Sequence, residues 1–247
     1  MNRPDFIELA SGDKIPILYE DRSVIAIDKP RGWMLVPFSW QRTARNLQAA
    51  IASSIAAGSW WARARGLKFL RYIHRLDSDT SGILLFARSQ GAVDTYTRLF
   101  ESRQMDKTYL VVAHGNPRKA GWTCDLKLAP DPKQIGRMKV DARRGKDAET
   151  HFRVLQTRDD KVAGPLTLIE AKPVTGRTHQ IRVHLAESGH GVIGDTLYGP
   201  GKSLRLKFPL GLRAVSLQYR DPFQGRVVAI TAPSEHFLQE FGFGSGG

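Results

Sequence analysis

The apolar run Gly82–Ala87, which reads Gly-Ile-Leu-Leu-Phe-Ala, limits most strongly how this chain can fold. It lacks the alternation of polar and apolar residues that marks a half-exposed strand, so it predicts a central strand buried on both faces. The turn-rich segment Asp77–Ser81 precedes the run directly. Asp77 is therefore expected just before a buried strand.

Other strands are expected along the whole chain. Residues Pro16–Asp28 form two apolar runs about the turn Glu20–Arg22 and end at the breaker Lys29–Gly32, which is typical of a hairpin. Pro130–Asp147 predicts a polar loop or a loosely paired ribbon. The remaining strands are expected at Lys107–Ala113, His151–Thr157, Leu166–Ala171, Ala214–Tyr219 and Val227–Ala232.

Few helices are expected between these strands. Thr43 precedes an apolar stripe at four-residue spacing that ends at Gly58, and Ser89 begins a second helix that ends near Arg103. Thr178–Ser188 predicts a third helix, and Ser234 begins a last one. The helices interrupt the strands irregularly, which favours an α+β fold over a doubly wound sheet.

The charge of the chain indicates a polyanionic partner. Its 247 residues include 37 Lys and Arg against 24 Asp and Glu, a formal charge of +13 with a pI of about 10.1. Nucleic acid is the leading partner and an anionic membrane surface the second. Two basic groups indicate a folded face rather than a disordered arm: Arg63, Arg65, Lys68 and Arg71, and then Arg137, Lys139, Arg143, Arg144 and Lys146.

A single cysteine, Cys124, excludes an intramolecular disulfide and any zinc site built from several cysteines. The segment Met1–Pro16 lacks the apolar core of a signal peptide, and no apolar run is long enough to cross a bilayer. We therefore expect a cytoplasmic protein with no membrane association.

Three familiar site motifs fail on their context. Gly242–Gly247 has the letters of a dinucleotide-binding loop but no helix can follow it, and Gly201–Ser203 lacks the first glycine of a phosphate-binding loop. The seven histidines contain no metalloprotease pattern, so no metal is expected. Asp77 and Asp79 could suggest the paired carboxylates of a glycosidase, but two residues apart in a turn they need not converge. Asp79 is expected to cap that turn.

The segment His74–Ala87 as a whole closely resembles the signature of the RluA-type family of pseudouridine synthases. Ile17–Gly32 resembles the opening hairpin of the family, and Lys107–Val111 its tyrosine motif. Pro173–Leu185 resembles its third motif, and Gly194–Gly199 the sequence that usually follows. Mild departures stand at Val36-Pro37, where many relatives carry a histidine, and at Gly191 in place of a proline.

The resemblance implies a single catalytic domain, residues 16–241, with a mixed, mainly antiparallel central sheet flanked by a few helices and loops. Residues 1–15 are then an N-terminal extension and residues 242–247 a flexible tail. No room is expected for the small S4 RNA-binding domain of some relatives, so the catalytic domain itself must recognise the RNA. A monomer without an obligate protein partner is expected.

The implied reaction breaks the bond from ribose C1′ to uracil N1, turns the base and rejoins it through C5, which needs no cofactor or metal. By the same resemblance Asp77 is the catalytic nucleophile, and Arg182 is the cation that keeps it ionised. Tyr109 contacts the uracil, unless it is an ordinary aromatic of the strand core.

RNA contacts are also implied by the resemblance. A uridine inside a helix must be flipped out, and Arg75 is the residue expected to fill the gap. Arg177 is expected to contact RNA. His74 and His179 are candidates for the same surface, and a structural role is the favoured alternative for His74.

Two other functions stay open from the sequence. One is a non-catalytic RNA-binding or ribosome-assembly protein that kept the fold, and the other is a nucleoside or glycoside hydrolase that would release free base. The sequence leaves open whether the RNA is ribosomal or transfer RNA and which uridine is modified.

Overall fold

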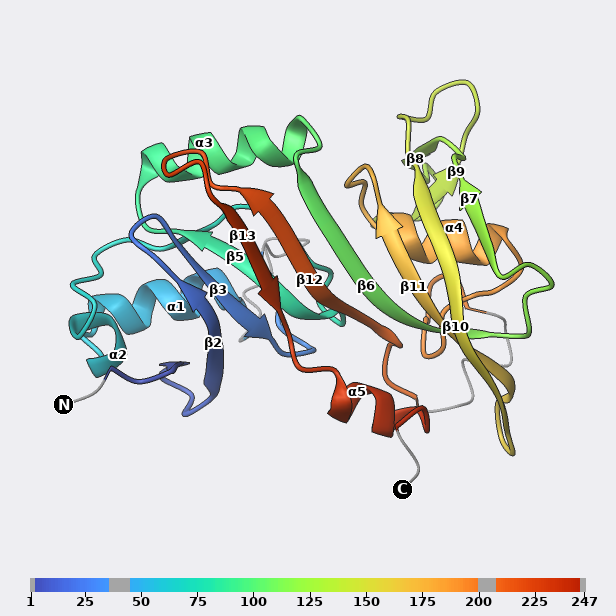
Figure 1. Cartoon of the computed structure of the whole chain (residues 1–247), viewed down its shortest axis with the longest axis horizontal. Coiled ribbons are helices and arrows are strands. Elements are labelled where there is room, and N and C mark those ends of the chain that lie inside the picture. The colour runs from blue at the N-terminus through green and yellow to red at the C-terminus, as the bar shows by residue number, and fades with distance from the viewer. Residues whose placement is uncertain (1–2, 36–44, 200–207, 245–247) are drawn as a thin grey trace. The chain divides into compact units, whose positions relative to one another are not determined.

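A computed structural model describes residues 3–35, 45–199 and 208–244. The chain forms two compact units, which are described separately below: residues 1–105 with 216–232, and residues 106–215 with 233–247. Both are built on strands with a few helices, as expected for an α+β protein (Figure 1). The departure at Val36-Pro37 and the segment Gly201–Ser203 lie outside the described residues.

The first unit is a sheet in which β5, Ser81–Ala87, is the central strand. Every residue of β5 is buried, which confirms the prediction from its apolar run. The strand pairs antiparallel with β3, Val24–Lys29, and with the short β4, Arg71–Tyr72.

The expected hairpin is present on one side of β5. β2, Lys14–Glu20, pairs antiparallel with β3, and Asp21 Oδ1 accepts the backbone N–H groups of Ser23 and Val24 at 2.7 and 2.9 Å. β1, Phe6–Glu8, lies in the stretch expected as an extension and pairs with β2. On the other side of β5 the strand order continues with β12, Leu212–Arg220, whose later residues pair with β13, Val227–Thr231.

The described residues of the first unit include three helices: α1, Leu47–Ala56; α2, Trp60–Arg63; and α3, Gln90–Glu101. Thr43, the expected cap of α1, lies outside the described residues, and the side chain of Asn46 caps the helix by accepting the Ala49 N–H. Ser89 caps α3 through the Ala92 N–H, as predicted. The short α2 was not predicted, because one turn leaves no periodic stripe to detect.

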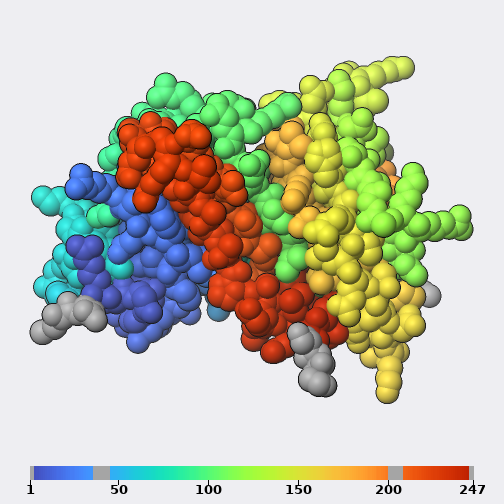
Figure 2. Space-filling model, viewed as in Figure 1, coloured from blue at the N-terminus to red at the C-terminus, as the bar shows by residue number. Residues whose placement is uncertain are grey.

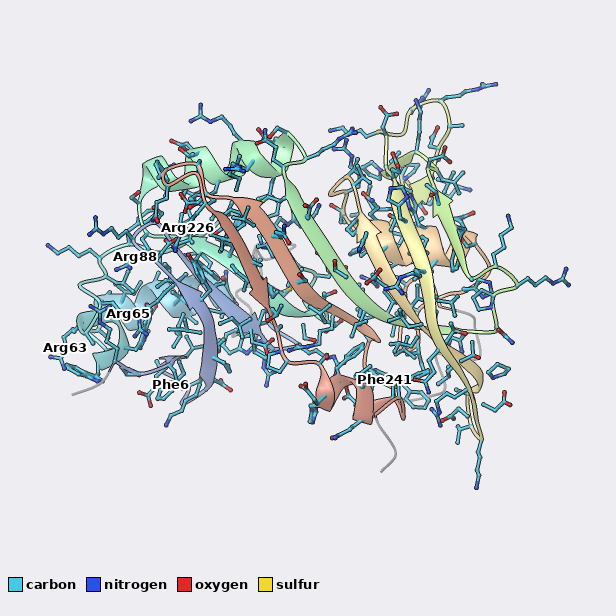
Figure 3. The ribbon with its side chains drawn as sticks, viewed as in Figure 1. Phe6, Arg63, Arg65, Arg88, Arg226 and Phe241 are labelled. Atoms are coloured by element: carbon cyan, nitrogen blue, oxygen red, sulfur yellow. The ribbon has the colours of Figure 1, made fainter. Side chains whose placement is uncertain are left out.

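One member of the first basic group is part of the interior of this unit. The Arg65 side chain is 3% exposed, and its Nε donates to Glu20 at 2.6 Å. Arg88 in turn donates to the backbone oxygen of Arg65 at 3.1 Å (Figure 3). Arg65 therefore stabilises the unit and is not part of a basic surface, whereas Arg63, Lys68 and Arg71 are exposed.

In the described part of the second unit, four strands form a sheet in the order β6, β11, β10, β7, and each of these pairings is antiparallel. The sequence predicted three of them, and β7 was missed because its four residues are flanked by polar segments. Cys124 ends β7 and is buried, which raises the pKa of its thiol. Their bounds are Met105–His114 for β6, Gly164–Pro173 for β11, Thr150–Asp160 for β10 and Gly121–Cys124 for β7.

A separate two-stranded ribbon interrupts this unit where a loop or loosely paired ribbon was predicted. β8, Leu128–Pro130, pairs antiparallel with β9, Met138–Val140. Figure 2 shows the yellow-green loop between these strands projecting from the surface of its unit. Leu128 and Val183 belong to one apolar cluster, which fixes the base of the ribbon to the helix α4, Gln180–Glu187.

The described part of the second unit also includes two helices. α4, Gln180–Glu187, lies against β10 and β11, and α5 spans Glu235–Glu240 after Ser234, as predicted (Figure 1). Phe243 is buried beside Phe237 and Phe241, so the first part of the expected tail packs on the unit.

Candidate active site

Asp77 stands in a loop of the first unit between β4 and β5. The loop begins with the Ile73 N–H, which donates to Leu85 O at 2.9 Å, and it turns where the Thr80 N–H donates to Asp77 O at 3.2 Å. Asp77 itself is half-buried, with Leu76 buried before it. The predicted order of turn and buried strand is confirmed.

Lys29, at the end of β3, holds this loop through its backbone. Its side chain is fully buried, and Nζ donates to the carbonyl oxygens of Ser78 at 2.8 Å, Thr80 at 2.9 Å and Pro30 at 3.0 Å. An ammonium has three N–H donors, so these bonds use all of them. The residues on either side of Asp79 are therefore fixed to the neighbouring strand.

Burial changes the chemistry of this ammonium. It lowers the pKa of Lys29 to about 8, against the opposing effect of the Asp79 and Asp77 charges. The sequence interpretation placed Lys29 only in a chain-breaking turn and gave it no role. The sequence did contain a signal for a role of Lys29, because it stands at the end of an apolar strand. A lysine that is buried there must find polar partners.

His74 serves the structure of the same loop. Its Nε2 accepts the Leu85 N–H at 3.2 Å, and its ring stacks on Phe100 of α3 with centroids 4.5 Å apart. An accepting Nε2 cannot carry a proton, so the proton of the neutral ring is on Nδ1. These contacts favour the structural alternative for His74, while the neighbouring Arg75 is exposed.

Tyr109 lies in β6 of the second unit, opposite Ala171 of β11. It is half-buried and packs against an apolar cluster that includes Ile181 and Leu185 of α4. Lys107 precedes it by two residues and so projects from the same face of the strand. Burial lowers the pKa of Lys107 to about 8, and its Nζ lies 3.4 Å from Thr175 O.

Arg182 of α4 forms a bidentate ion pair inside the second unit. Its Nε and Nη2 donate to the two carboxylate oxygens of Asp195, both at 2.7 Å, and the side chains are 8% and 0% exposed. Asp195 Oδ1 also accepts the N–H groups of Leu197 and Tyr198. Burial alone would raise the pKa of Asp195, but the Arg182 hydrogen bonds and charge outweigh it and the pKa lies below its ordinary value.

The backbone around Asp195 requires glycine at position 194. Gly194 has φ +72°, and a Cβ there would lie 2.2 Å from the oxygen of Pro209. A side chain at this position is therefore excluded both by strain and by space. The sequence interpretation recognised the segment Gly194–Gly199 as a motif but assigned no role to its members.

His179 and Arg177 stand at the start of α4. His179 has a left-handed backbone with φ 54°, which is why α4 begins two residues after the predicted start at Thr178, and its Nδ1 lies 2.8 Å from the Tyr198 hydroxyl. Arg177 is half-buried, and its Nε donates to Asp147 O at 2.9 Å. Both side chains thus have structural partners in the second unit.

Two findings apply to the described part of the chain, residues 3–35, 45–199 and 208–244. No group of three or more His, Cys, Asp or Glu side chains there could hold a metal ion. Among the same residues, no helix has the length and apolar character needed to span a membrane.

A family profile described as RNA pseudouridylate synthase matches residues 23–187, which include Asp77, Tyr109 and Arg182. The chain belongs to this family. The expected RluA-type synthase is thereby confirmed, and with it an isomerase that acts on RNA.

Comparison with individual proteins supports the same family assignment. An uncharacterized RNA pseudouridine synthase of Bacillus subtilis, YlyB, is 32% identical over 232 residues, which cover 94% of this chain and 73% of that protein. The dual-specificity RNA pseudouridine synthase RluA of Escherichia coli is 29% identical over 219 residues, or 89% and 93% of the two chains. The solved structure of human RNA pseudouridylate synthase domain containing 1 has a TM-score of 0.72 at 26% identity, covering 92% of this chain and 86% of that one.

The site residues of the synthase are thus divided between its units. His74, Arg75 and Asp77 belong to the first unit, and Tyr109, Arg177, His179 and Arg182 to the second. The sequence interpretation missed Lys29, Asp195 and Tyr198. Each of these supports a predicted residue or its loop.

Proposed function

We propose that this synthase converts specific uridines of structured ribosomal or transfer RNA to pseudouridine, with the Asp77 carboxylate as nucleophile. Arg182 is its ion partner, Tyr109 lies against the uracil, and Arg75 fills the space left by the flipped base. The observation that carries the proposal is the fixed backbone around Asp77, which the buried Lys29 ammonium holds at Ser78 and Thr80.

A fixed backbone suits a nucleophile because the reacting atoms must be held in a near-attack geometry. The carboxylate is ionised at neutral pH and can attack covalently or remove a proton. In the net reaction the C1′–N1 bond breaks, the C1′–C5 bond forms, the C5 proton leaves and N1 gains a proton. Atoms and charge balance without a redox step.

Arg182 suits the role of ion partner because its guanidinium plane is already oriented. The bidentate bond to Asp195 uses Nε and Nη2, so one edge of the fork is committed to the interior of its unit. We propose that the opposite edge, at Nη1, serves the Asp77 carboxylate during the reaction.

An RNA substrate accounts for the charge of the chain and for the exposed basic residues of the ribbon. Lys133, Arg143, Arg144 and Lys146 are exposed there. Base flipping by Arg75 costs a few kcal/mol in a paired region, which makes unpaired or distorted uridines the favoured targets. The Escherichia coli relative is named a dual-specificity enzyme, so the proposal keeps more than one RNA class.

The proposal is tested with ribosomal and transfer RNA transcripts that carry tritium at uridine C5, because each isomerisation releases that atom to water. Asp77→Ala is expected to abolish release while the Kd for RNA changes less than about threefold, since a carboxylate adds no attraction to phosphate. Asp79→Ala, which removes the exposed neighbouring carboxylate, is the matched control and should keep most of the activity.

Two results would contradict the proposal. Undiminished tritium release by Asp77→Ala would show that Asp77 is not the nucleophile. Release of free uracil by the wild-type protein would indicate a hydrolase. Mapping of pseudouridines in cells with and without the gene, by carbodiimide-stopped primer extension, identifies the RNA and the uridine.

A further inference from the structure

Tyr198 is the point at which three segments of the second unit meet. Its hydroxyl oxygen accepts the Met138 N–H of β9 at 2.7 Å and lies 2.8 Å from His179 Nδ1 at the start of α4. A phenol can accept one hydrogen bond and donate another, so both contacts are satisfied together. Tyr198 lies outside the residues that the family profile matches, 23–187.

The ring of Tyr198 lies against Arg182. The guanidinium carbon of Arg182 is 5.2 Å from the ring centroid, within the range of a cation–π contact. Asp195 holds the same guanidinium through two hydrogen bonds in its own plane. Arg182 is therefore restrained along one edge by a carboxylate and is also in contact with the face of an aromatic ring.

A second guanidinium lies over the Tyr198 ring. Arg137, the residue before β9, has its guanidinium carbon 5.4 Å from the Tyr198 centroid. Met138, the next residue, supplies the N–H to the hydroxyl and packs with Tyr198 on the cluster of Leu128 and Val183. The β8–β9 ribbon thus contacts Tyr198 through a charge, a hydrogen bond and an apolar side chain.

The ribbon has the composition of a surface that binds a polyanion. Between residues 127 and 147 it contains seven Lys and Arg against three Asp, and Ile135 at the tip is 94% exposed. Neighbouring phosphates would be attracted to this segment. Any displacement of β9 would act directly on the ring and hydroxyl of Tyr198.

We propose that Tyr198 is a positioning residue for Arg182 and that it couples the basic ribbon to the orientation of that guanidinium. The catalytic consequence rests on the proposed function, in which Arg182 serves Asp77. RNA that binds the ribbon would set the position of β9 and, through Tyr198, the orientation of the Arg182 guanidinium. Tyr198 itself touches no reacting atom in this proposal.

Tyr198→Phe tests the positioning without any need for activity, because it keeps the ring and removes only the hydroxyl. The rate of hydrogen exchange at Arg182 Nε–H, followed by ¹⁵N NMR, should rise roughly threefold to tenfold, the effect of losing about one hydrogen bond. Arg65 Nε–H, which donates to Glu20 in the first unit, is the internal control and should keep its exchange rate (Figure 3). Unchanged exchange at Arg182 would overturn the proposal.

The coupling to chemistry is tested by separating rate from affinity. Tyr198→Phe should lower the single-turnover rate at saturating RNA roughly threefold to tenfold, with the Kd for RNA within about twofold of wild type. Tyr19→Phe is the matched control, since its hydroxyl also makes two hydrogen bonds, to Asp21 and from Arg226, on segments that carry none of the site residues. It should lower the Tm and leave the rate unchanged.

The outcomes are distinguishable. Faster exchange at Arg182 with an unchanged single-turnover rate would overturn the coupling, and an equal loss of rate in Tyr19→Phe would reduce the role of Tyr198 to general stability. A wild-type protein that forms no pseudouridine in any RNA would refute the proposed function, while the exchange experiment would still decide whether Tyr198 positions Arg182.

Discussion

The loop that carries Asp77 and the helix that carries Arg182 are held by different kinds of bond. In the first unit, one buried ammonium binds backbone carbonyls, including those of Ser78 and Thr80. In the second unit, Arg182 is held by the side chains of Asp195 and Tyr198. Backbone carbonyls are present whatever the residue, so the first restraint tolerates changes in the loop, whereas the second depends on the identity of each partner.

The largest expected effect comes from breaking the side-chain restraint. Asp195→Ala leaves the Arg182 guanidinium buried without its carboxylate, which should lower the free energy of unfolding by about 3–5 kcal/mol. Urea denaturation measures this loss. Asp160→Ala is the comparison in the same unit, because Asp160 also accepts two backbone N–H groups and one arginine but is more exposed, and about 1–2 kcal/mol is expected.

Equal losses in these two variants would contradict the special weight given to the buried pair. Asp195→Asn sharpens the comparison, since the amide keeps the shape but replaces one acceptor by a donor facing Arg182. It should therefore recover only part of the stability.

A smaller loss is expected from breaking the backbone restraint. Lys29→Met removes the donor to three carbonyls but also removes a buried charge, so the free energy of unfolding should fall by about 2–3 kcal/mol. Backbone hydrogen exchange should increase at Thr80 while Leu217 of β12 stays protected. Lys172→Met, at an exposed lysine paired with Glu170, is the control and should change stability by less than about 0.5 kcal/mol.

Retained protection at Thr80 in Lys29→Met would show that the loop does not depend on the ammonium. The result would then favour the turn itself, through Asp77 O and the Thr80 N–H, as the source of order.

The smallest effects are in the pH dependence, and the two restraints should respond at opposite ends of the scale. The lowered pKa of Lys29 means that the folded protein loses this proton near pH 8 while the unfolded chain keeps it up to 10.5, so the Lys29 contribution to stability rises as the pH increases between these values. The lowered pKa of Asp195 gives a contribution that is present above about pH 3.8 and is lost as the pH falls through the folded value.

Wild type is therefore compared with Lys29→Met from pH 7.5 to 10.5, and with Asp195→Asn from pH 5 to 2.5, by urea unfolding at each pH. The stability difference should grow with pH in the first series and shrink on acidification in the second. A flat difference in either series would mean that folding does not shift the pKa of the corresponding group.

Local patterns were sufficient to predict much of the fold. The uniform apolar run of β5 and the Ser89 cap of α3 depend on neighbouring residues only, and both predictions are confirmed. β1 and β4 were not predicted, because strands of three and two residues exist only through their partners β2 and β5. The left-handed backbone of His179 likewise has no local signal, since histidine rarely adopts it.

The site was predictable as a set of residue identities but not as a set of supports. Asp77 and Arg182 stand in long motifs that a reader of the sequence can find, and their catalytic roles stay predictions. The pairing of Arg182 with Asp195 and the bonds from Lys29 to Ser78 and Thr80 join residues 13 to 51 positions apart, so only the folded chain brings them together. A sequence motif therefore identifies the proposed reacting groups but not the residues that hold them in place.

The burial of Cys124 makes the protein a convenient background for site-specific labelling. It is the single cysteine of the sequence, and its raised pKa leaves little thiolate at neutral pH. A Lys133→Cys substitution at the exposed ribbon loop would then be the preferred target of a maleimide dye. Fluorescence from that position would report directly when the ribbon meets an RNA, without removing any native residue of the core.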